Sequence, residues 1–304
     1  VSTWSGDKWK LGGGTVWGWI SYDPGLDLIF YGTGNPGPWN PDMRPGDNKW
    51  TSTIFARDPD DGQARWAYQV VPHDMWDYDE IMENVLVDME WNGQPRKLLL
   101  HPGRSGFVFV LDRQTGELLA ADPFQPINWA SGYDLATGRP QVNAEKMTRQ
   151  GQVTRGICPS STGAKEFVPS AFSPRTALLY IPAHNTCMDY EALEVNYIAG
   201  TPYLGASVRM YQGEGHHGEL VAWDPIRRQK AWGAVDMKFP IYSGVLATGG
   251  DLVFYGTMDG WFKAVDARSG EELWQFQTGS GIVGNPITFT APDGKQYVAI
   301  YSGV

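Results

Sequence analysis

Basic residues are scarce in this chain of 304 residues, in which 24 Lys and Arg face 34 Asp and Glu and the formal net charge is −10. No basic run occurs, which argues against nucleic acid or an anionic membrane surface as a partner. No apolar run is long enough to span a membrane. No secretory signal is visible either, although a targeting segment can lie upstream of Val1.

Cysteine is almost absent, since Cys158 and Cys187 are the only two. Nothing near them resembles a zinc pattern, so the residues alone are compatible both with a disulfide and with two free buried thiols. Helical patterns are also lacking beyond a turn or two near 191–197. The 37 Gly and 21 Pro favour turns instead, and 14 Trp with a hydrophobic share of 42% provide for a sizeable core.

We therefore expect an all-β fold of many short strands. The length suits one large all-β domain or two ordinary ones. Gly, Asp, Asn and Pro separate the strand-like segments, as hairpin turns require. The expected strands cover residues 28–31, 51–57, 65–70, 97–100, 107–111, 178–182, 219–223, 252–256, 261–265, 272–276 and 296–300.

An eleven-residue pattern recurs along the chain. Residues 56–66 (ARDPDDGQARW) return as 264–274 (AVDARSGEELW), with a looser copy at 222–232 and weaker copies at 110–120 and 132–142. The pattern indicates a strand, an Asp-started tight turn, Gly at a left-handed position, a second strand and a Trp that docks on its neighbour. Five copies favour four-stranded units in series, a β-propeller, over unrelated hairpins.

The stretch 73–80 (HDMWDYDE) holds four carboxylates in seven positions, next to two aromatic side chains. A solvated turn is the ordinary interpretation of such a run. However, Trp76 and Tyr78 are costly to expose together. In extended backbone, Asp77 and Asp79 share one face, where two carboxylates repel unless a cation or a proton lies between them. This pattern indicates a hard-metal site or a catalytic base.

Two glycine-rich stretches complete the candidate site. Residues 10–19 contain three successive glycines before an aromatic pair, but lack the Lys and Ser/Thr of a phosphate loop. Such glycines let a flat group approach the backbone while a Trp stacks on it; a tight bend with core tryptophans explains them equally well. In the second stretch, 32–40, Asn35 offers an amide oxygen to a cation or simply forms a turn.

Taken together, these stretches resemble the pyrroloquinoline-quinone (PQQ) alcohol dehydrogenases of the methanol dehydrogenase type. Order and spacing fit over essentially the whole chain. The family is about twice as long and forms an eight-bladed propeller, so the resemblance implies that residues 1–304 are a single partial β-propeller domain, without the N-terminal blades and the extreme C-terminus. The family's glutamate metal ligand and its vicinal disulfide would lie upstream. The matching motifs are 12–19 (GGGTVWGW), 34–40 (GNPGPWN), 44–50 (RPGDNKW) and 72–77 (PHDMWD).

The resemblance implies a role for each matching residue. Trp17 would form the floor under the PQQ ring, with Thr15 beside it, and Asn35 would ligate the metal. Asp77 would take the alcohol proton and touch the metal. Arg104 would hydrogen-bond the reactive quinone oxygen. The resulting reaction is hydride transfer from a primary alcohol, methanol or a similar small alcohol, to PQQ, with a metal as Lewis acid.

Other positions refine the expectation. Asp79, two places after the catalytic Asp, resembles the lanthanide-dependent branch rather than the calcium-dependent one, and it would be a further metal ligand. Glu166 stands where many relatives have an Asn beside the cofactor, and Tyr242 where methanol dehydrogenases have a Trp, so we expect both to contact PQQ but in an altered way. The resemblance also implies a disulfide between Cys158 and Cys187.

The same resemblance implies a periplasmic enzyme that passes electrons to a c-type cytochrome, and it leaves a homodimer open. Three alternatives remain at the level of sequence. One is a calcium-dependent PQQ alcohol dehydrogenase, and another is a non-catalytic propeller scaffold built from the same repeats. The third is that this piece folds poorly and is inactive alone, because an incomplete propeller exposes strand edges.

Overall fold

A computed structural model of the chain describes residues 2–303 and shows an all-β protein in which every strand pairing is antiparallel. Its contacts divide it into two compact units, Val1–Phe167 with Thr186–Gln212, and Val168–Asn185 with Gly213–Val304. Within the described residues, helix is limited to three short 3-10 turns: η1 (Lys8–Lys10), η2 (Pro41–Met43) and η3 (Ala144–Lys146). None of the described helices has the length and hydrophobicity to cross a membrane.

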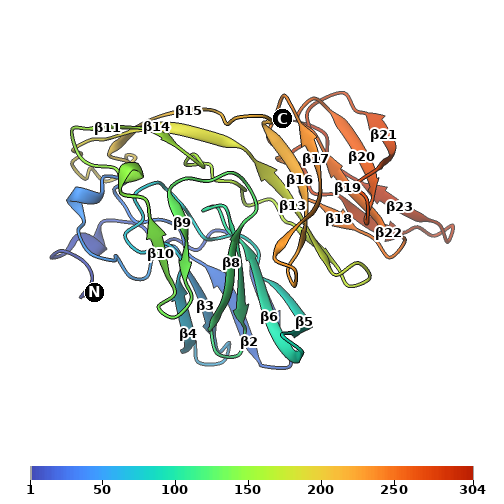
Figure 1. Cartoon of the computed structure of the whole chain (residues 1–304), viewed down its shortest axis with the longest axis horizontal. Coiled ribbons are helices and arrows are strands. Elements are labelled where there is room, and N and C mark those ends of the chain that lie inside the picture. The colour runs from blue at the N-terminus through green and yellow to red at the C-terminus, as the bar shows by residue number, and fades with distance from the viewer. Residues whose placement is uncertain (1, 304) are drawn as a thin grey trace. The chain divides into compact units, whose positions relative to one another are not determined.

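The first unit contains two four-stranded sheets whose strands follow one another along the chain (Figure 1). One sheet has the order β1 (Ile20–Asp23), β2 (Leu28–Gly32), β3 (Thr53–Arg57), β4 (Ala64–Gln69). The other has the order β5 (Val85–Trp91), β6 (Gln94–Pro102), β7 (Phe107–Asp112), β8 (Leu118–Pro123). The hairpin β9 (Ala130–Asp134), β10 (Arg139–Val142) and a sheet ordered β11 (Val153–Ile157), β14 (Thr186–Ala192), β15 (Ala206–Gln212) complete the unit.

The second unit contains two further four-stranded sheets and a hairpin. The first sheet is ordered β12 (Ala171–Ser173), β13 (Leu178–His184), β16 (Gly218–Asp224), β17 (Gln229–Asp236). The second is ordered β18 (Leu246–Ala247), β19 (Leu252–Gly256), β20 (Trp261–Asp266), β21 (Glu272–Gln277), and β22 (Ile287–Thr290) pairs with β23 (Gln296–Ala299). The four-stranded sheets, two in each unit, are the blades of a β-propeller, as the repeat predicts.

The eleven-residue repeat forms the same turn in all five copies. The amide of the fifth turn residue donates to the carbonyl of the Asp that starts the turn. That fifth residue has a positive φ in each copy, which is why Gly is favoured there and why Arg228 is an exception. Four copies also carry a β-bulge at their first residue, after positions 56, 110, 222 and 264. The repeat is therefore a structural unit, as predicted.

The predicted docking is confirmed for two of the three terminal tryptophans, one in each unit. The third, Trp274, is 47% exposed and contacts aromatic rings of its own sheet. The Trp66 indole donates to the carbonyl of Arg113 at 3.0 Å and lies against Gly116. A Cβ added to Gly116 would lie 2.7 Å from the Trp66 ring. In the second unit, Trp232 lies in the same way against Gly270. Trp66 and Trp232 thus pack on the turn of the next repeat, and each joins two sheets.

Two further expectations have clear outcomes. The disulfide between Cys158 and Cys187 is confirmed, within the first unit. The expected helical turns near 191–197 are wrong, because β14 runs to Ala192 and the chain continues there without helix. Residues 186–192 pair along their whole length with β15, and this pairing satisfies their backbone groups better than an isolated turn.

Candidate active site

The acidic stretch lies in the loop that joins β4 to β5, at one end of the first two sheets. Trp76 and Tyr78 are fully buried, with ring centroids 5.6 Å apart, and both pack on Trp129. The Trp76 indole donates to the carbonyl of Lys146, and the Tyr78 hydroxyl donates to that of Pro159. These two aromatic side chains anchor the loop in the core, so the stretch is not a solvated turn.

Asp77 and Asp79 converge, although not for the reason that the sequence suggests. Asp77 has a φ of +73°, so the backbone is left-handed there and not extended. The carboxylates nevertheless approach one atom: Arg104 Nη1 lies 3.5 Å from Asp77 Oδ2 and 3.3 Å from Asp79 Oδ2. The Asp79 side chain is only 8% exposed, so it faces the site and not solvent.

Arg104 follows β6 and is the centre of the cluster. Its Nη2 donates to both carboxylate oxygens of Glu166 at 3.1 Å, and its Nη1 donates to the carbonyl of Asp77 at 3.3 Å. The guanidinium carbon lies 5.8 Å from the centre of the Trp17 ring. The structure thus brings together Trp17, Asp77, Asp79, Arg104 and Glu166, all of which the sequence nominates.

The cluster carries an excess of negative charge. Three carboxylates face the single guanidinium of Arg104, and all are largely buried. Burial raises the pKa of Asp77 well above its ordinary value; Arg104 lowers it, and the neighbouring Asp79 raises it further. Crowded carboxylates of this kind are stabilised by a bound cation. The donor set therefore fits a metal with a preference for oxygen.

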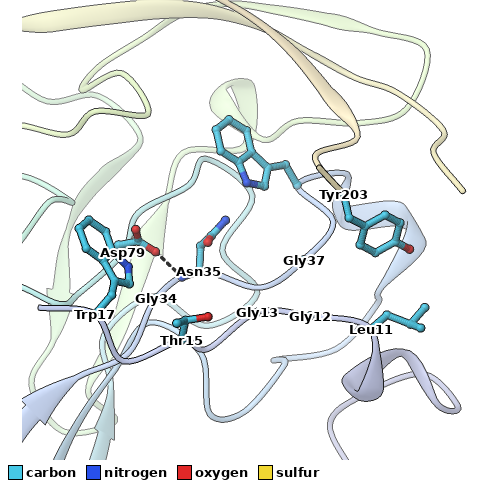
Figure 2. Close-up of a pocket in the computed structure, with 11 residues that line it drawn as sticks. Leu11, Gly12, Gly13, Thr15, Trp17, Gly34, Asn35, Gly37, Asp79 and Tyr203 are labelled. Carbon is cyan, nitrogen blue, oxygen red and sulfur yellow. Dashed lines mark hydrogen bonds between the residues drawn. The ribbon is translucent and has the colours of Figure 1, made fainter. Parts of the chain in front are cut away.

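A cavity of about 430 Å³ extends from this cluster along the two glycine-rich stretches (Figure 2). Trp17 and Asp79 lie at one end and Leu11 and Tyr203 at the other, with Asn35 between them. The Trp17 side chain is 46% exposed, so much of its surface is free for a stacked group. The cavity lining is completed by Gly12, Gly13, Thr15, Gly34, Gly37 and Trp39.

The glycines bring two backbone segments together at the floor of this cavity. The amide of Gly14 donates to the carbonyl of Asn35, and that of Gly34 donates to the carbonyl of Thr15, both at 2.9 Å. A Cβ on Gly13 would lie 2.7 Å from Pro36, so only Gly permits this approach. The glycines were expected to admit a flat ligand; here they admit the neighbouring loop, and Thr15 and Trp17 line the space beside it.

Asn35 and Asp79 are linked through the backbone. The amide N–H of Asn35 donates to Asp79 Oδ1, and the Asn35 side-chain amide donates to the carbonyl of Pro36 at 3.4 Å. Asn35 and Asp79 thus present oxygen atoms on one side of the cavity. Asp77 does not line the cavity and lies beside them at Arg104. In the part of the chain that the structure describes, no three His, Cys, Asp or Glu side chains form a metal site by themselves.

Tyr242 lies in the second unit, where its ring centre is 4.4 Å from that of His184. Its role as a cofactor contact stays a prediction. Sequence reasoning missed the special place of Asp74, which was counted only as one of four acids. It is fully buried, and its carboxylate accepts hydrogen bonds from the backbone amides of Trp76 and Tyr78. An Asp two and four residues before these amides was the available signal.

The four-stranded blades and their repeat define the class of fold, a β-propeller, and the arginine–carboxylate cluster lies beside an exposed Trp. Residues 1–128 and 215–298 match the PQQ family, described as the β-propeller domain of glucose, ethanol and alcohol dehydrogenases, and the chain belongs to this family.

Similar proteins narrow the relationship. The lanthanide-dependent methanol dehydrogenase of Methylacidiphilum fumariolicum (strain SolV) is 54% identical over all of this chain and 50% of its own length. Subunit 1 of the methanol dehydrogenase (cytochrome c) of Methylobacterium organophilum is 45% identical over 100% of this chain and 50% of its own length. A europium-containing methanol dehydrogenase structure matches 99% of this chain and 53% of its own, with a TM-score of 0.97 and 54% identity. The chain thus spans about half the length of these relatives.

Proposed function

We propose that the complete protein to which this chain belongs oxidises methanol or a similar small primary alcohol to the aldehyde, with PQQ and a lanthanide ion bound beside Asp77. The observation that carries this proposal is the position of Arg104, which contacts Asp77, Asp79 and Glu166 at the Trp17 end of the cavity. A non-catalytic scaffold has no need for this buried, charged arrangement, because burying unbalanced charge is costly.

The chain's own residues would divide the work. Trp17 and Thr15 would hold the flat cofactor, and Asn35 and Asp79 would hold the ion. When bound, PQQ would supply the hydride acceptor and the ion would supply a Lewis acid. Arg104 donates hydrogen bonds in the site and would stabilise negative charge on an oxygen there.

Asp77 would remove the proton from the alcohol oxygen. Burial raises the pKa of this carboxyl group, and a higher pKa makes its carboxylate a stronger base. Its contacts with Arg104, through both the carboxylate and the backbone carbonyl, hold the base at the edge of the cluster.

The lanthanide is proposed over calcium because of Asp79. A trivalent ion of about the size of calcium attracts an additional carboxylate more strongly than a divalent ion does. Asp79 is buried and directed into the site, as that role requires. The europium-containing and lanthanide-dependent relatives support this choice.

Location, electron acceptor and assembly are parts of the same proposal. The disulfide supports an oxidising compartment, the periplasm. The relative described as a cytochrome c methanol dehydrogenase subunit supports a c-type cytochrome as acceptor, which makes the enzyme an oxidoreductase of CH–OH donors with a cytochrome acceptor. A homodimer is proposed as well, and size-exclusion chromatography of the complete protein tests it.

Cofactor loading and turnover test the proposed function together. The complete protein, reconstituted with PQQ and a lanthanide, should show bound PQQ by absorption and mass analysis and should oxidise methanol with an artificial electron acceptor. Asp77→Asn should still bind PQQ but lose several orders of magnitude in kcat, because the base acts in the transition state. Near-normal turnover by this variant would contradict the assignment of the base, and absence of PQQ binding would contradict the function as a whole.

A further inference from the structure

We propose that Asp74 is a positioning residue for Asp77: its carboxylate bridges the amides on either side of Asp77 and so holds the base in its left-handed backbone conformation. This inference rests on the proposed function, in which Asp77 is the base. The observation is a pair of hydrogen bonds. Asp74 Oδ1 accepts from the amide of Trp76 at 3.0 Å, and Asp74 Oδ2 accepts from the amide of Tyr78 at 2.9 Å.

The bridge differs from the other aspartate turns of this chain. In the repeat turns, a single carboxylate oxygen accepts from two successive amides. Asp134 Oδ1, for example, accepts from Ala136 at 2.8 Å and from Thr137 at 3.2 Å. Asp74 uses both of its oxygens and passes over Asp77, whose own amide is not part of the bridge. The backbone of Asp77 therefore lies between two amides, those of Trp76 and Tyr78, that are both hydrogen-bonded to Asp74.

Asp77 needs such support because a positive φ is unfavourable for a residue with a Cβ, even for Asp. A shift to negative φ would turn its carboxylate and its carbonyl away from Arg104, which now contacts both. The side chains of Trp76 and Tyr78 are fixed in the core, so the loop cannot rotate as a whole. The backbone conformation of Asp77 is then the part of the loop that can still change, and the bridge restrains it.

Asp74 is itself held from the opposite side. It is fully buried, and the buried guanidinium of Arg44 donates to its backbone carbonyl. Arg44 Nη1 also donates to Asn48 Oδ1 at 2.8 Å. The preceding residue, His73, is tied through its amide to the carbonyl of Asp47 at 3.1 Å. The bridge therefore starts from a buried, hydrogen-bonded part of the first unit.

The substitution Asp74→Asn tests whether both carboxylate oxygens are needed, as in the Asp74 bridge, or only one, as in the turn at Asp134. An Asn side chain has one acceptor oxygen, so this variant must lose one of the two bonds, whereas Asp134→Asn keeps its single accepting oxygen and serves as the matched control. In the complete, PQQ- and lanthanide-loaded protein, Asp74→Asn should lower kcat about 100-fold, the effect expected for a shift of roughly 1 Å at the reacting group. The KM for methanol should change less than about twofold, because only the transition state uses the base.

A double-variant cycle distinguishes positioning from a general loss of structure. If Asp74 acts through Asp77, Asp74→Asn should have no further effect on kcat in an Asp77→Asn background. Hydrogen exchange gives a readout that needs no activity: the Trp76 and Tyr78 amides should exchange at least about tenfold faster in Asp74→Asn and unchanged in Asp134→Asn. Asp74→Ser, which also keeps one acceptor, is carried through the same measurements in case Asp74→Asn does not fold.

The outcomes separate this inference from the proposed function. A normal kcat or unchanged amide exchange in Asp74→Asn, with Asp77→Asn impaired, would overturn the positioning role alone. The same holds if the two substitutions multiply in the double variant, since Asp74 would then act independently of the base. Normal turnover by Asp77→Asn would overturn the proposed function instead.

Discussion

Arg104 and Glu166 form a two-bond pair: the Nη2 group of the arginine lies 3.1 Å from each carboxylate oxygen of the glutamate. Both contacts come from one nitrogen, so Glu166 holds one amino group of the guanidinium through a charge-assisted hydrogen bond shared between its two oxygens. The other amino group of Arg104 is thereby directed toward Asp77 and Asp79. Glu166 thus acts on the site through Arg104 and through its own charge.

Glu166→Gln should weaken lanthanide binding about tenfold. The substitution removes one negative charge and keeps the shape of the side chain, and loss of a residue that orients the groups around an ion typically weakens metal binding about 10- to 100-fold. Titration of the complete protein with europium, followed by its luminescence, measures the affinity. Glu145→Gln, an exposed glutamate of the same unit, is the control. Equal affinity in Glu166→Gln and the natural protein would show that this charge does not reach the ion.

Gly116→Ala should destabilise the protein by about 1–3 kcal/mol more than Gly62→Ala. The two glycines occupy the same place in the repeat turn, with φ of +78° and +70°, so the backbone cost of Ala is shared. Only at Gly116 does the new Cβ meet the ring of a docked tryptophan, Trp66; at Gly62 the space is open. Urea denaturation of both variants gives the difference. Equal losses of stability would mean that Trp66 yields without cost.

Removal of the disulfide should lower the free energy of unfolding by about 2–4 kcal/mol. Cys158 and Cys187 are 29 residues apart, and a cross-link that closes a loop of this length restricts the unfolded chain to this extent. The double variant Cys158→Ser, Cys187→Ser is compared with the natural protein by urea denaturation. Titration of the denatured, unreduced natural protein should find no free thiol. Two titratable thiols there would contradict the bond.

The eleven-residue repeat predicted the blades because its residues specify the turn and the Trp contact without reference to the rest of the chain. The Asp, the Gly at positive φ and the terminal Trp specify turn and docking within eleven residues, and Trp66 and Trp232 dock as expected. The order of the third sheet was not predictable in this way. Its strands β13 and β16 pair across an insertion of more than thirty residues, which itself joins a sheet in the first unit. Such long-range pairing depends on tertiary packing.

The sequence predicted which residues form the candidate site, but not the backbone conformation that brings them together. Spacing alone suggested that Asp77 and Asp79 share a face, and both do approach Arg104. The left-handed backbone at Asp77 and the bridge from Asp74 do not appear as a periodic pattern in the sequence. A single φ angle is set by hydrogen bonds that form only in the folded protein. Tyr242 belongs to the other unit, and its contact with a cofactor remains a prediction.

The dependence of activity on the ion tests the central claim most directly. The complete, PQQ-loaded protein is assayed for methanol oxidation with lanthanum and with calcium, and Asp79→Ala is assayed beside it. We predict high activity with lanthanum, a weak response to calcium and loss of the lanthanum response in Asp79→Ala, because Asp79 adds the carboxylate that a trivalent ion favours. Full activity with calcium alone, or an Asp79→Ala variant that keeps its lanthanum dependence, would contradict the assignment.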